Sequence, residues 1–209
     1  MPELKGRRRH QRFAWTTVGW IVLLASPLAA RPLVAQAKPE APDLSAVRSA
    51  LKKYEDPYMA IHDGFYSTLG CVEIGHAGAP GHVPYKPGGM GVHFLNLGHI
   101  SPVPDPAKPQ VLIYEPAGAK LRLVAAEWFV PLSTGVKQRP TLWGRPFDGP
   151  MMGHPPLVPM ELTHYDLHVW LYKSNPLGIF EPTNPDVKCV GHPYRLVEEA
   201  PELVPEPKP

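Results

Sequence analysis

The sequence predicts an α+β fold, in which an N-terminal helix is followed by a curved antiparallel β-sheet or a small β-barrel with long loops rich in proline and glycine. Three observations lead to this prediction. A segment near residue 50 is amphipathic with helical periodicity. Beyond residue 70, proline and glycine recur at intervals too short for long helices. Between them lie apolar runs of strand length, of which residues 163–172 alternate with period two.

Residues 1–37 have the layout of a secretory signal peptide. Basic side chains precede an apolar stretch at residues 13–28, which is too short and too interrupted to span a membrane comfortably. The triplet Ala35-Gln36-Ala37 matches the small-residue pattern that precedes a cleavage site. We therefore expect a mature chain of residues 38–209 in the periplasm or outside the cell, without a stable membrane span. An uncleaved N-terminal anchor is the alternative.

The mature chain is predicted to be mildly acidic. Residues 1–37 contain six of the 21 Lys and Arg residues and one of the 19 Asp and Glu residues, which leaves 15 basic and 18 acidic side chains. A chain with this balance has no basic face that would attract phosphate, so nucleic acid is not expected as a partner. Its length suits one domain with a substantial core.

Cys71 and Cys189 are the two cysteines, and both lie in the predicted mature chain. An even number of cysteines in an exported protein predicts a disulfide bond. Two separate thiols are one alternative. The other is a copper site that combines the thiolate of Cys189 with His192.

The expected elements begin with a short tether at residues 38–42. Apolar residues at spacings of three and four then predict a helix over residues 44–55, which ends before Pro57. A single exported domain is expected to cover residues 43–197. The tail, residues 198–209, is rich in proline and glutamate and is predicted to be disordered.

Several strands are expected after the helix. One is predicted over residues 92–97. Residues 111–115 and 121–130 are rich in apolar and β-branched side chains, and the turn residues 116–119 between them predict a hairpin. The following stretch, residues 131–161, is too long for a simple turn and is expected to form a structured excursion over the domain.

The segment 163–172 is the clearest predicted strand, because its side chains sort at period two. One face is apolar. The other face carries His164, Asp166, His168, Trp170 and Tyr172. Residues two apart on a strand are about 6.6 Å apart, so Asp166 with either histidine could supply two ligands to one ion, whereas His164 and His168 are too far apart to do so.

A two-histidine, one-carboxylate metal site is the main functional hypothesis. Nine of the ten histidines lie in the mature chain, and imidazole is the commonest metal ligand at neutral pH. His93 follows a Gly-Gly-Met-Gly-Val run, and Glu127 lies within an apolar strand, where an inward-facing carboxylate must be paired or coordinated. With His168 they would form an open metal site on three strands. The alternatives are a hydrogen-bonded or exposed Glu127 and histidines that each satisfy a local carbonyl.

His164, Asp166 and His154 are the next candidate ligands or neighbours of the site. The divalent ion is expected to be zinc, or another ion that prefers imidazole and carboxylate, rather than copper. Copper would be favoured by a soft ligand set, which the sequence offers in Met151, Met152, His154, Met160 and His164. Methionine is also a common filler of cores.

Motifs along most of the mature chain resemble those of a group of secreted bacterial proteins. The resemblance includes the run Gly88-Gly89-Met90-Gly91-Val92-His93, Tyr114-Glu115-Pro116, and His164-Tyr165-Asp166-Leu167-His168-Val169-Trp170. Further matches are Lys53-Tyr54-Glu55-Asp56 with Gly64-Phe65, Glu127 with Val130-Pro131, Asn175-Pro176-Leu177-Gly178, and Asn184-Pro185 through Cys189. The resemblance implies one exported domain and no particular reaction.

The function expected from these observations is an exported protein with a His/carboxylate pocket for a divalent metal ion or a small polar ligand. The chain has no nucleophile elbow, zincin helix motif or phosphate-binding loop, so the sequence does not decide whether it is an enzyme. One alternative is a non-catalytic module with an apolar ligand groove lined by Trp143, Phe147, Pro155, Pro156 and Trp170. The other is a structural protein of the cell envelope with incidental histidines.

Overall fold

The structure is a computed structural model, and it describes residues 42–208. The predicted signal peptide and nearly all of the predicted tether lie outside the described residues. Within the described part of the chain, no helix is long and apolar enough to cross a membrane.

A short helical segment precedes the sheet. It begins with α1 (Ser45–Leu51), tightens into the 3-10 turn η1 (Lys52–Glu55) and continues as α2 (Pro57–His62). The helix expected over residues 44–55 is thus an α-helix only in its first part. Asp56 caps α2 by accepting a hydrogen bond from the Tyr58 amide, and Pro57 fits the first helical position because it needs no amide partner there.

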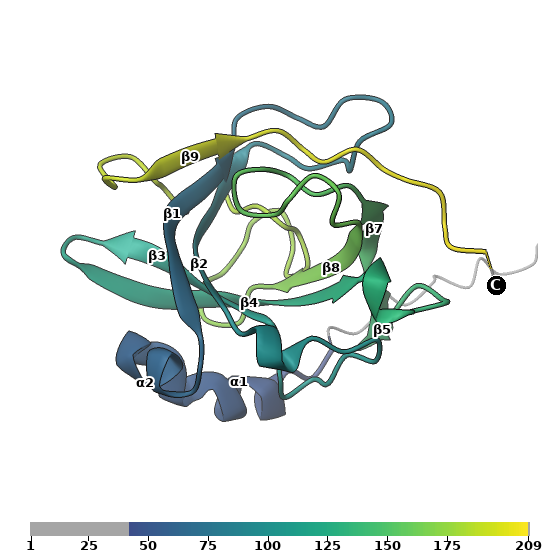
Figure 1. Cartoon of the computed structure of the whole chain (residues 1–209). Coiled ribbons are helices and arrows are strands. Elements are labelled where there is room, and N and C mark those ends of the chain that lie inside the picture. Colours follow the sequence, from purple (N-terminus) through teal and green to yellow (C-terminus); the bar gives the residue numbers. More distant parts are fainter. Residues whose placement is uncertain (1–41, 209) are drawn as a thin grey trace, which may run out of the picture. The chain divides into compact units, whose positions relative to one another are not determined.

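Seven strands form one curled sheet, which wraps part of the way into a barrel (Figure 1). Its order is β7-β8-β4-β3-β2-β1-β9. The strands are β1 (Tyr66–Ile74), β2 (Gly88–Leu95), β3 (Val111–Ala117), β4 (Lys120–Pro131), β7 (Asp148–Met151), β8 (His164–Val169) and β9 (Arg195–Glu198). Two shorter strands, β5 (Thr141–Leu142) and β6 (Arg145–Pro146), form a separate pair, and the 3-10 turns η2 (Leu97–His99) and η3 (Leu132–Thr134) follow β2 and β4.

The predicted hairpin is present and is longer than expected. The sequence pattern places Pro116 and Ala117 in the turn, but they pair with Leu121 and Lys120. The connection is therefore a two-residue turn, in which Gly118 takes a positive φ of 64° at no steric cost. The strand expected over 92–97 begins four residues earlier, at Gly88, and the one expected over 163–172 is limited to β8.

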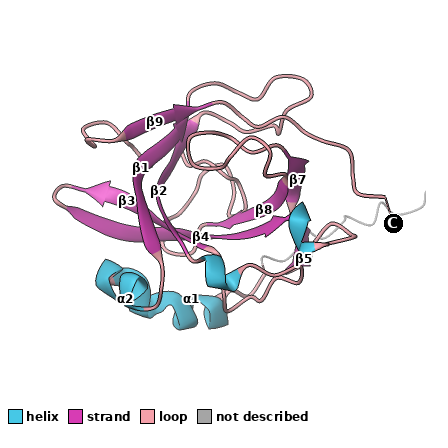
Figure 2. Ribbon diagram, viewed as in Figure 1, coloured by secondary structure: helices cyan, strands magenta, loops and turns pink. Residues whose placement is uncertain are grey.

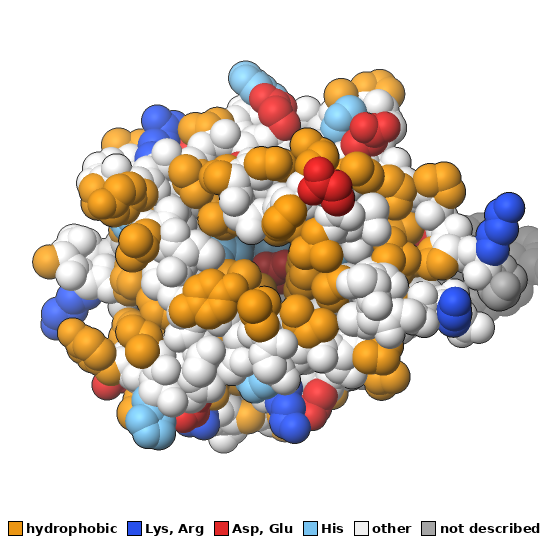
Figure 3. Space-filling model, viewed as in Figure 1, with side chains coloured by type: hydrophobic (Ala, Val, Ile, Leu, Met, Phe, Trp, Pro, Cys, Tyr) orange, Lys and Arg blue, Asp and Glu red, His pale blue; other side chains and the backbone are white. Residues whose placement is uncertain are grey.

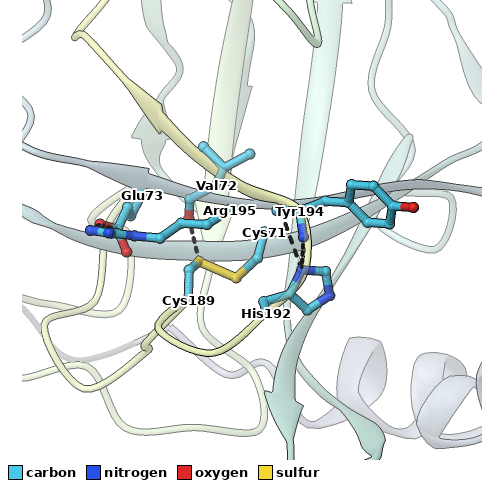
Figure 4. The surroundings of a disulfide bond; sticks show 7 residues. All are labelled: Cys71, Val72, Glu73, Cys189, His192, Tyr194 and Arg195. Carbon is cyan, nitrogen blue, oxygen red and sulfur yellow. Dashed lines mark hydrogen bonds and ion pairs between the residues drawn. A yellow bond between two sulfur atoms is a disulfide. The ribbon is translucent and has the colours of Figure 1, made fainter.

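The sheet is mixed, which corrects the expectation of a purely antiparallel one. β9 pairs in parallel with β1, with Cys71 opposite Arg195, while all other neighbouring strands are antiparallel. A disulfide joins Cys71 to Cys189, six residues before β9, as the even cysteine count predicts. The bond holds the chain beside β1, where Arg195 forms an ion pair with Glu73 (Figure 4).

The two faces of the sheet carry different side chains. On one face, Tyr165, Leu167 and Val169 of β8 join residues of β2, β3 and β4 in a core cluster that packs against α1 and η1. Figure 2 shows α1 and α2 at this side of the strands. The other face lines the concave interior, which includes two smaller apolar clusters, one around Val72 and Tyr85 and one around Ile113 and Trp170.

The described part of the tail that was expected to be disordered, residues 198–208, makes defined contacts with the domain. Glu198 ends β9 and is buried, Ala200 belongs to an apolar cluster, and the amide of Val204 donates to the carbonyl of Pro150. Further along, Glu206 pairs with Arg139 and accepts a hydrogen bond from Tyr165. The proline-rich composition indicates an extended chain, and here that extended chain finds partners for its amides and carbonyls along the domain.

Candidate metal centre

His93, Glu127 and His168 come together on the concave face of the sheet. Oε2 of Glu127 lies 3.8 Å from Nε2 of His93 and 3.5 Å from Nε2 of His168. One ligand atom from each residue lies within 4.8 Å of the other two. The three groups that the sequence singled out as first ligands therefore meet in one place.

The strand register explains how they meet. Glu127 on β4 is paired directly with His168 on β8, so both side chains emerge side by side on the same face. His93 lies on β2, and β3 separates it from β4. Adjacent strands are about 4.8 Å apart, so the backbones of β2 and β4 are about 10 Å apart. The curl of the sheet lets the long side chains converge across β3 on the concave side.

Close packing of β2 on β3 fixes the backbone just before His93. Gly91 has a φ of 107°, and a Cβ atom there would lie 2.5 Å from the carbonyl oxygen of Tyr114. Only glycine tolerates both conditions, because it has no Cβ atom. Gly91 therefore lets β2 approach β3 just before His93, whereas Gly88 and Gly89 lie close to the backbone at Asn184 and Val187.

Burial determines the charge state of the three groups. Removal from water lowers the pKa of His93 to about 4 and that of His168 well below its usual value, so both imidazoles are neutral at pH 7. Burial also raises the pKa of Glu127 to about 7. Neutral imidazole is the form that coordinates metal ions, so the two histidines are already prepared as ligands.

The site contains polar atoms that the protein itself does not satisfy. Neither ring nitrogen of His168 has a hydrogen-bond partner, and Nδ1 of His93 has none, although all three atoms are buried. The 3.5 Å separation of His168 from Glu127 is too long for a good hydrogen bond. Buried polar atoms without partners are rare and costly in native proteins, which indicates that these atoms have a partner outside the chain.

The separations suit a small cation. In a tetrahedral site, two ligand atoms that are each about 2.1 Å from the ion are about 3.4 Å apart. The distance from Glu127 to His168, 3.5 Å, is close to this value, and the distance to His93, 3.8 Å, is somewhat longer. The buried His/Glu group could therefore hold a metal ion with small adjustments of side-chain rotamers.

The second set of candidates, His164, Asp166 and His154, lies next to the centre and outside the three-residue group. Asp166 accepts a hydrogen bond from Tyr85, and His154 is 2.8 Å from Glu198. His164 is fully buried, contacts the carbonyl of Leu162 and stacks near Phe129. The sequence leaves open whether Asp166 accompanies His164 or His168. Oδ2 of Asp166 lies 4.0 Å from Nε2 of His164, and His168 faces Glu127 on the neighbouring strand.

A cavity of about 180 Å³ opens above the centre. Acidic and histidine side chains are visible at the floor of a hollow that is surrounded by hydrophobic side chains (Figure 3). His93, Glu127 and His168 line this cavity together with Asp166, His154 and Glu198. The centre is therefore buried within the protein and still accessible to a small molecule.

Two alternatives from the sequence are not supported by the geometry. The predicted aromatic groove is absent from the described cavity, because Phe147 and Trp170 are buried in core clusters and Trp143 packs against Trp128. The copper site at Cys189 is excluded by the disulfide, which removes the thiolate. In the methionine cluster, Met151 is buried near Tyr85, whereas Met160 is 48% exposed.

Tyr85 and Glu198 border the cavity and were not found by the sequence argument. Tyr85 lies in the irregular segment between β1 and β2, where no periodic pattern assigns a face to a side chain. The sequence pattern places Glu198 in the tail that is predicted to be disordered. The structure shows their connection to the site through their hydrogen-bond partners. Tyr85 donates to Asp166, and Glu198 contacts His154.

Comparison of the chain with protein-family models, with curated proteins and with solved structures found no match. The chemistry of the centre is therefore inferred from its residues and their geometry.

Proposed function

We propose that this protein binds one divalent metal ion through His93, Glu127 and His168, and that the ion is zinc. The observation that carries the proposal is the meeting of three buried donor atoms from three strands, with both ring nitrogens of His168 lacking any partner in the protein. A bound ion would coordinate one nitrogen of each imidazole and the carboxylate of Glu127, and it would offset part of the free-energy cost of burying these groups.

The type of donor supports zinc over copper(I). Two imidazole nitrogens and one carboxylate oxygen are ligands typical of zinc, with three protein ligands and a fourth position left open. The soft sulfur ligands that copper(I) prefers are not available from the cysteines, which form the disulfide. The open fourth position would face the cavity, where water or a small molecule can reach the ion.

We further propose that the protein works in an oxidising compartment, after export through its N-terminal signal. The disulfide between Cys71 and Cys189 supports this, because such bonds persist in the periplasm and outside cells. The resemblance to secreted bacterial proteins implies the same location.

Metal analysis of protein produced without a histidine tag tests the proposal. After loading with zinc and removal of excess ion, we expect about one zinc per chain, and His93→Ala and Glu127→Ala should each reduce retention by at least tenfold. His62→Ala is the matched control. His62 also contacts a carboxylate, Asp63 at 2.9 Å, but its side chain is 77% exposed. Less than about 0.1 zinc per chain would overturn the proposal.

A further inference from the structure

We propose that His164 and Asp166 bind a second divalent metal ion, next to the centre formed by His93, Glu127 and His168. The inference goes beyond the proposed function, which assigns a single zinc ion to that centre. It is carried by the distance between the two side chains, by buried atoms in both that have no partner in the described part of the chain, and by the balance of charge around them.

Strand β8 places the two side chains on one face. His164 and Asp166 are two residues apart on β8, so they share the face that also carries His168. Nε2 of His164 lies 4.0 Å from Oδ2 of Asp166. Two ligands of one tetrahedral ion are about 3.4 Å apart. A small rotation of the Asp166 side chain would therefore bring both atoms within reach of one ion.

The imidazole of His164 has a lone pair available for a metal ion. Its Nδ1 is 3.0 Å from the carbonyl oxygen of Leu162, and a carbonyl group can only accept a hydrogen bond, so Nδ1 carries the proton. Burial lowers the pKa of His164 to about 4, so the ring is neutral at pH 7. The other nitrogen, Nε2, is buried without a hydrogen-bond partner among the described residues. Its lone pair is therefore free to coordinate a cation.

Asp166 supplies an anionic oxygen ligand beside that lone pair. It is only 2% exposed. Oδ2 accepts one hydrogen bond, from the neutral hydroxyl of Tyr85, and Oδ1 is buried with no partner in the described chain. An ionised carboxylate in this position is costly to bury unless a positive charge lies close to it. A cation between Asp166 and His164 would provide that charge.

The charge around the cavity favours a second cation over a water molecule. Among the described residues, the cavity is lined by the carboxylates of Glu127, Asp166 and Glu198 and by no Lys or Arg side chain. His154 lies 2.8 Å from Glu198, and the proposed zinc ion would be held by Glu127. Asp166 is left without a cationic partner. A water molecule could donate hydrogen bonds to Asp166 and His164, but it would not balance the negative charge.

Two protein ligands predict a weaker site than the three of the first centre. Asp166 lines the cavity, so water molecules can reach the second ion and complete its coordination. Removal of free zinc should therefore release the second ion first and leave about one zinc per chain at the first centre. Binding of the second ion has to be measured at equilibrium with free zinc.

Equilibrium dialysis against increasing free zinc, followed by elemental analysis of the protein, tests the inference. We expect a second zinc ion that binds at least about tenfold more weakly than the first and is bound at about 0.1 mM free zinc. Asp166→Asn removes the charge and keeps the shape of the side chain, so this variant should bind one zinc ion fewer and retain the tightly bound one. Equal zinc binding by Asp166→Asn and the unaltered protein would overturn the inference.

A second variant and a control complete the test. His164→Phe keeps a ring beside Phe129 but has no ligand atom, and it should also bind one zinc ion fewer. His62→Ala removes an exposed histidine that contacts Asp63, and it should bind as much zinc as the unaltered protein. The tightly bound ion alone would overturn this inference and leave the proposed function standing. A weakly bound ion alone, lost in Asp166→Asn and His164→Phe, would support this inference and overturn the proposed function.

Discussion

Glu127 is the residue on which the centre depends most, because it is a buried carboxylate on a central strand. It contacts both histidines and is only 6% exposed. Without a cation, burial raises its pKa to about 7. The neighbouring imidazoles stay neutral and cannot serve as counter-charges, since burial lowers their pKa values. A bound cation would stabilise the ionised carboxylate and accept the imidazole lone pairs at once.

Metal affinity should consequently depend on pH through Glu127. Only the ionised carboxylate of Glu127 binds the metal. Because its pKa is about 7, the carboxyl group is protonated at lower pH and must lose that proton before metal can bind. Affinity should thus fall about tenfold for each pH unit below about 7 and level off above it. The histidines, with a pKa of about 4 for His93, compete with metal only at lower pH. Competition titrations with a zinc chelator from pH 5.5 to 8.5 measure this profile. An affinity independent of pH between 5.5 and 7 would contradict it.

At the scale of elements, β2 and β8 show how the strands deliver their ligands. In β8, alternation sends Tyr165 and Leu167 into the core cluster and His168 to the concave face. In β2, the close approach of Gly91 to Tyr114 sets the position of His93. The strands provide the ligand positions because each is packed on both faces and cannot shift register without exposing its apolar side.

Replacement of Gly91 should therefore damage the fold and the centre together. Gly91→Ala combines a strained φ with a clash against the Tyr114 carbonyl, and we expect a loss of about 2 to 4 kcal/mol in the free energy of unfolding. Zinc retention should fall as well, because β2 must move away from β3. Gly118→Ala is the control: its φ is also positive, but no atom lies within 4 Å of the added Cβ. Its expected cost is about 1 kcal/mol. Denaturant unfolding curves of the two variants give the comparison, and equal losses would argue against the close-packing explanation.

The sequence predicted the local features of the sheet better than its arrangement. Period-two alternation identified the two faces of β8, and the apolar run with a single acid marked Glu127 as unusual. The pairing of β9 with β1 could not be predicted, because a parallel contact between residues as far apart in the chain as Cys71 and Arg195 leaves no local pattern. The same holds for Tyr85 and Glu198, which approach the site from irregular segments.

At the scale of the whole molecule, the curl of the sheet and the addition of the edge strand β9 create the site. Three ligands spread over β2, β4 and β8 converge because the sheet bends around them, and β9 extends the sheet beyond β1. The disulfide closes a loop of 118 residues and holds this edge in place. The sequence indicated both cysteines and the three ligands, but the distance between the ligands follows from the curvature of the sheet.

Removal of the disulfide should lower the stability of the whole domain. For a loop of this length, the chain-entropy model gives an upper value of roughly 4 to 5 kcal/mol. The combined variant Cys71→Ala, Cys189→Ala should unfold at a temperature lower by on the order of 10 °C. A reducing agent should produce the same shift in the unaltered protein and none in the variant. Scanning calorimetry measures both, and an unchanged midpoint would show that the bond contributes little to stability.

Anomalous diffraction from crystals of the zinc-loaded protein, recorded on both sides of the zinc absorption edge, tests the central claim most directly. The account predicts one strong anomalous peak on the concave face, about 2.0 to 2.2 Å from a ring nitrogen of His93, a ring nitrogen of His168 and a carboxylate oxygen of Glu127. A zinc peak held by other residues, with these three side chains making no contact to it, would contradict the account.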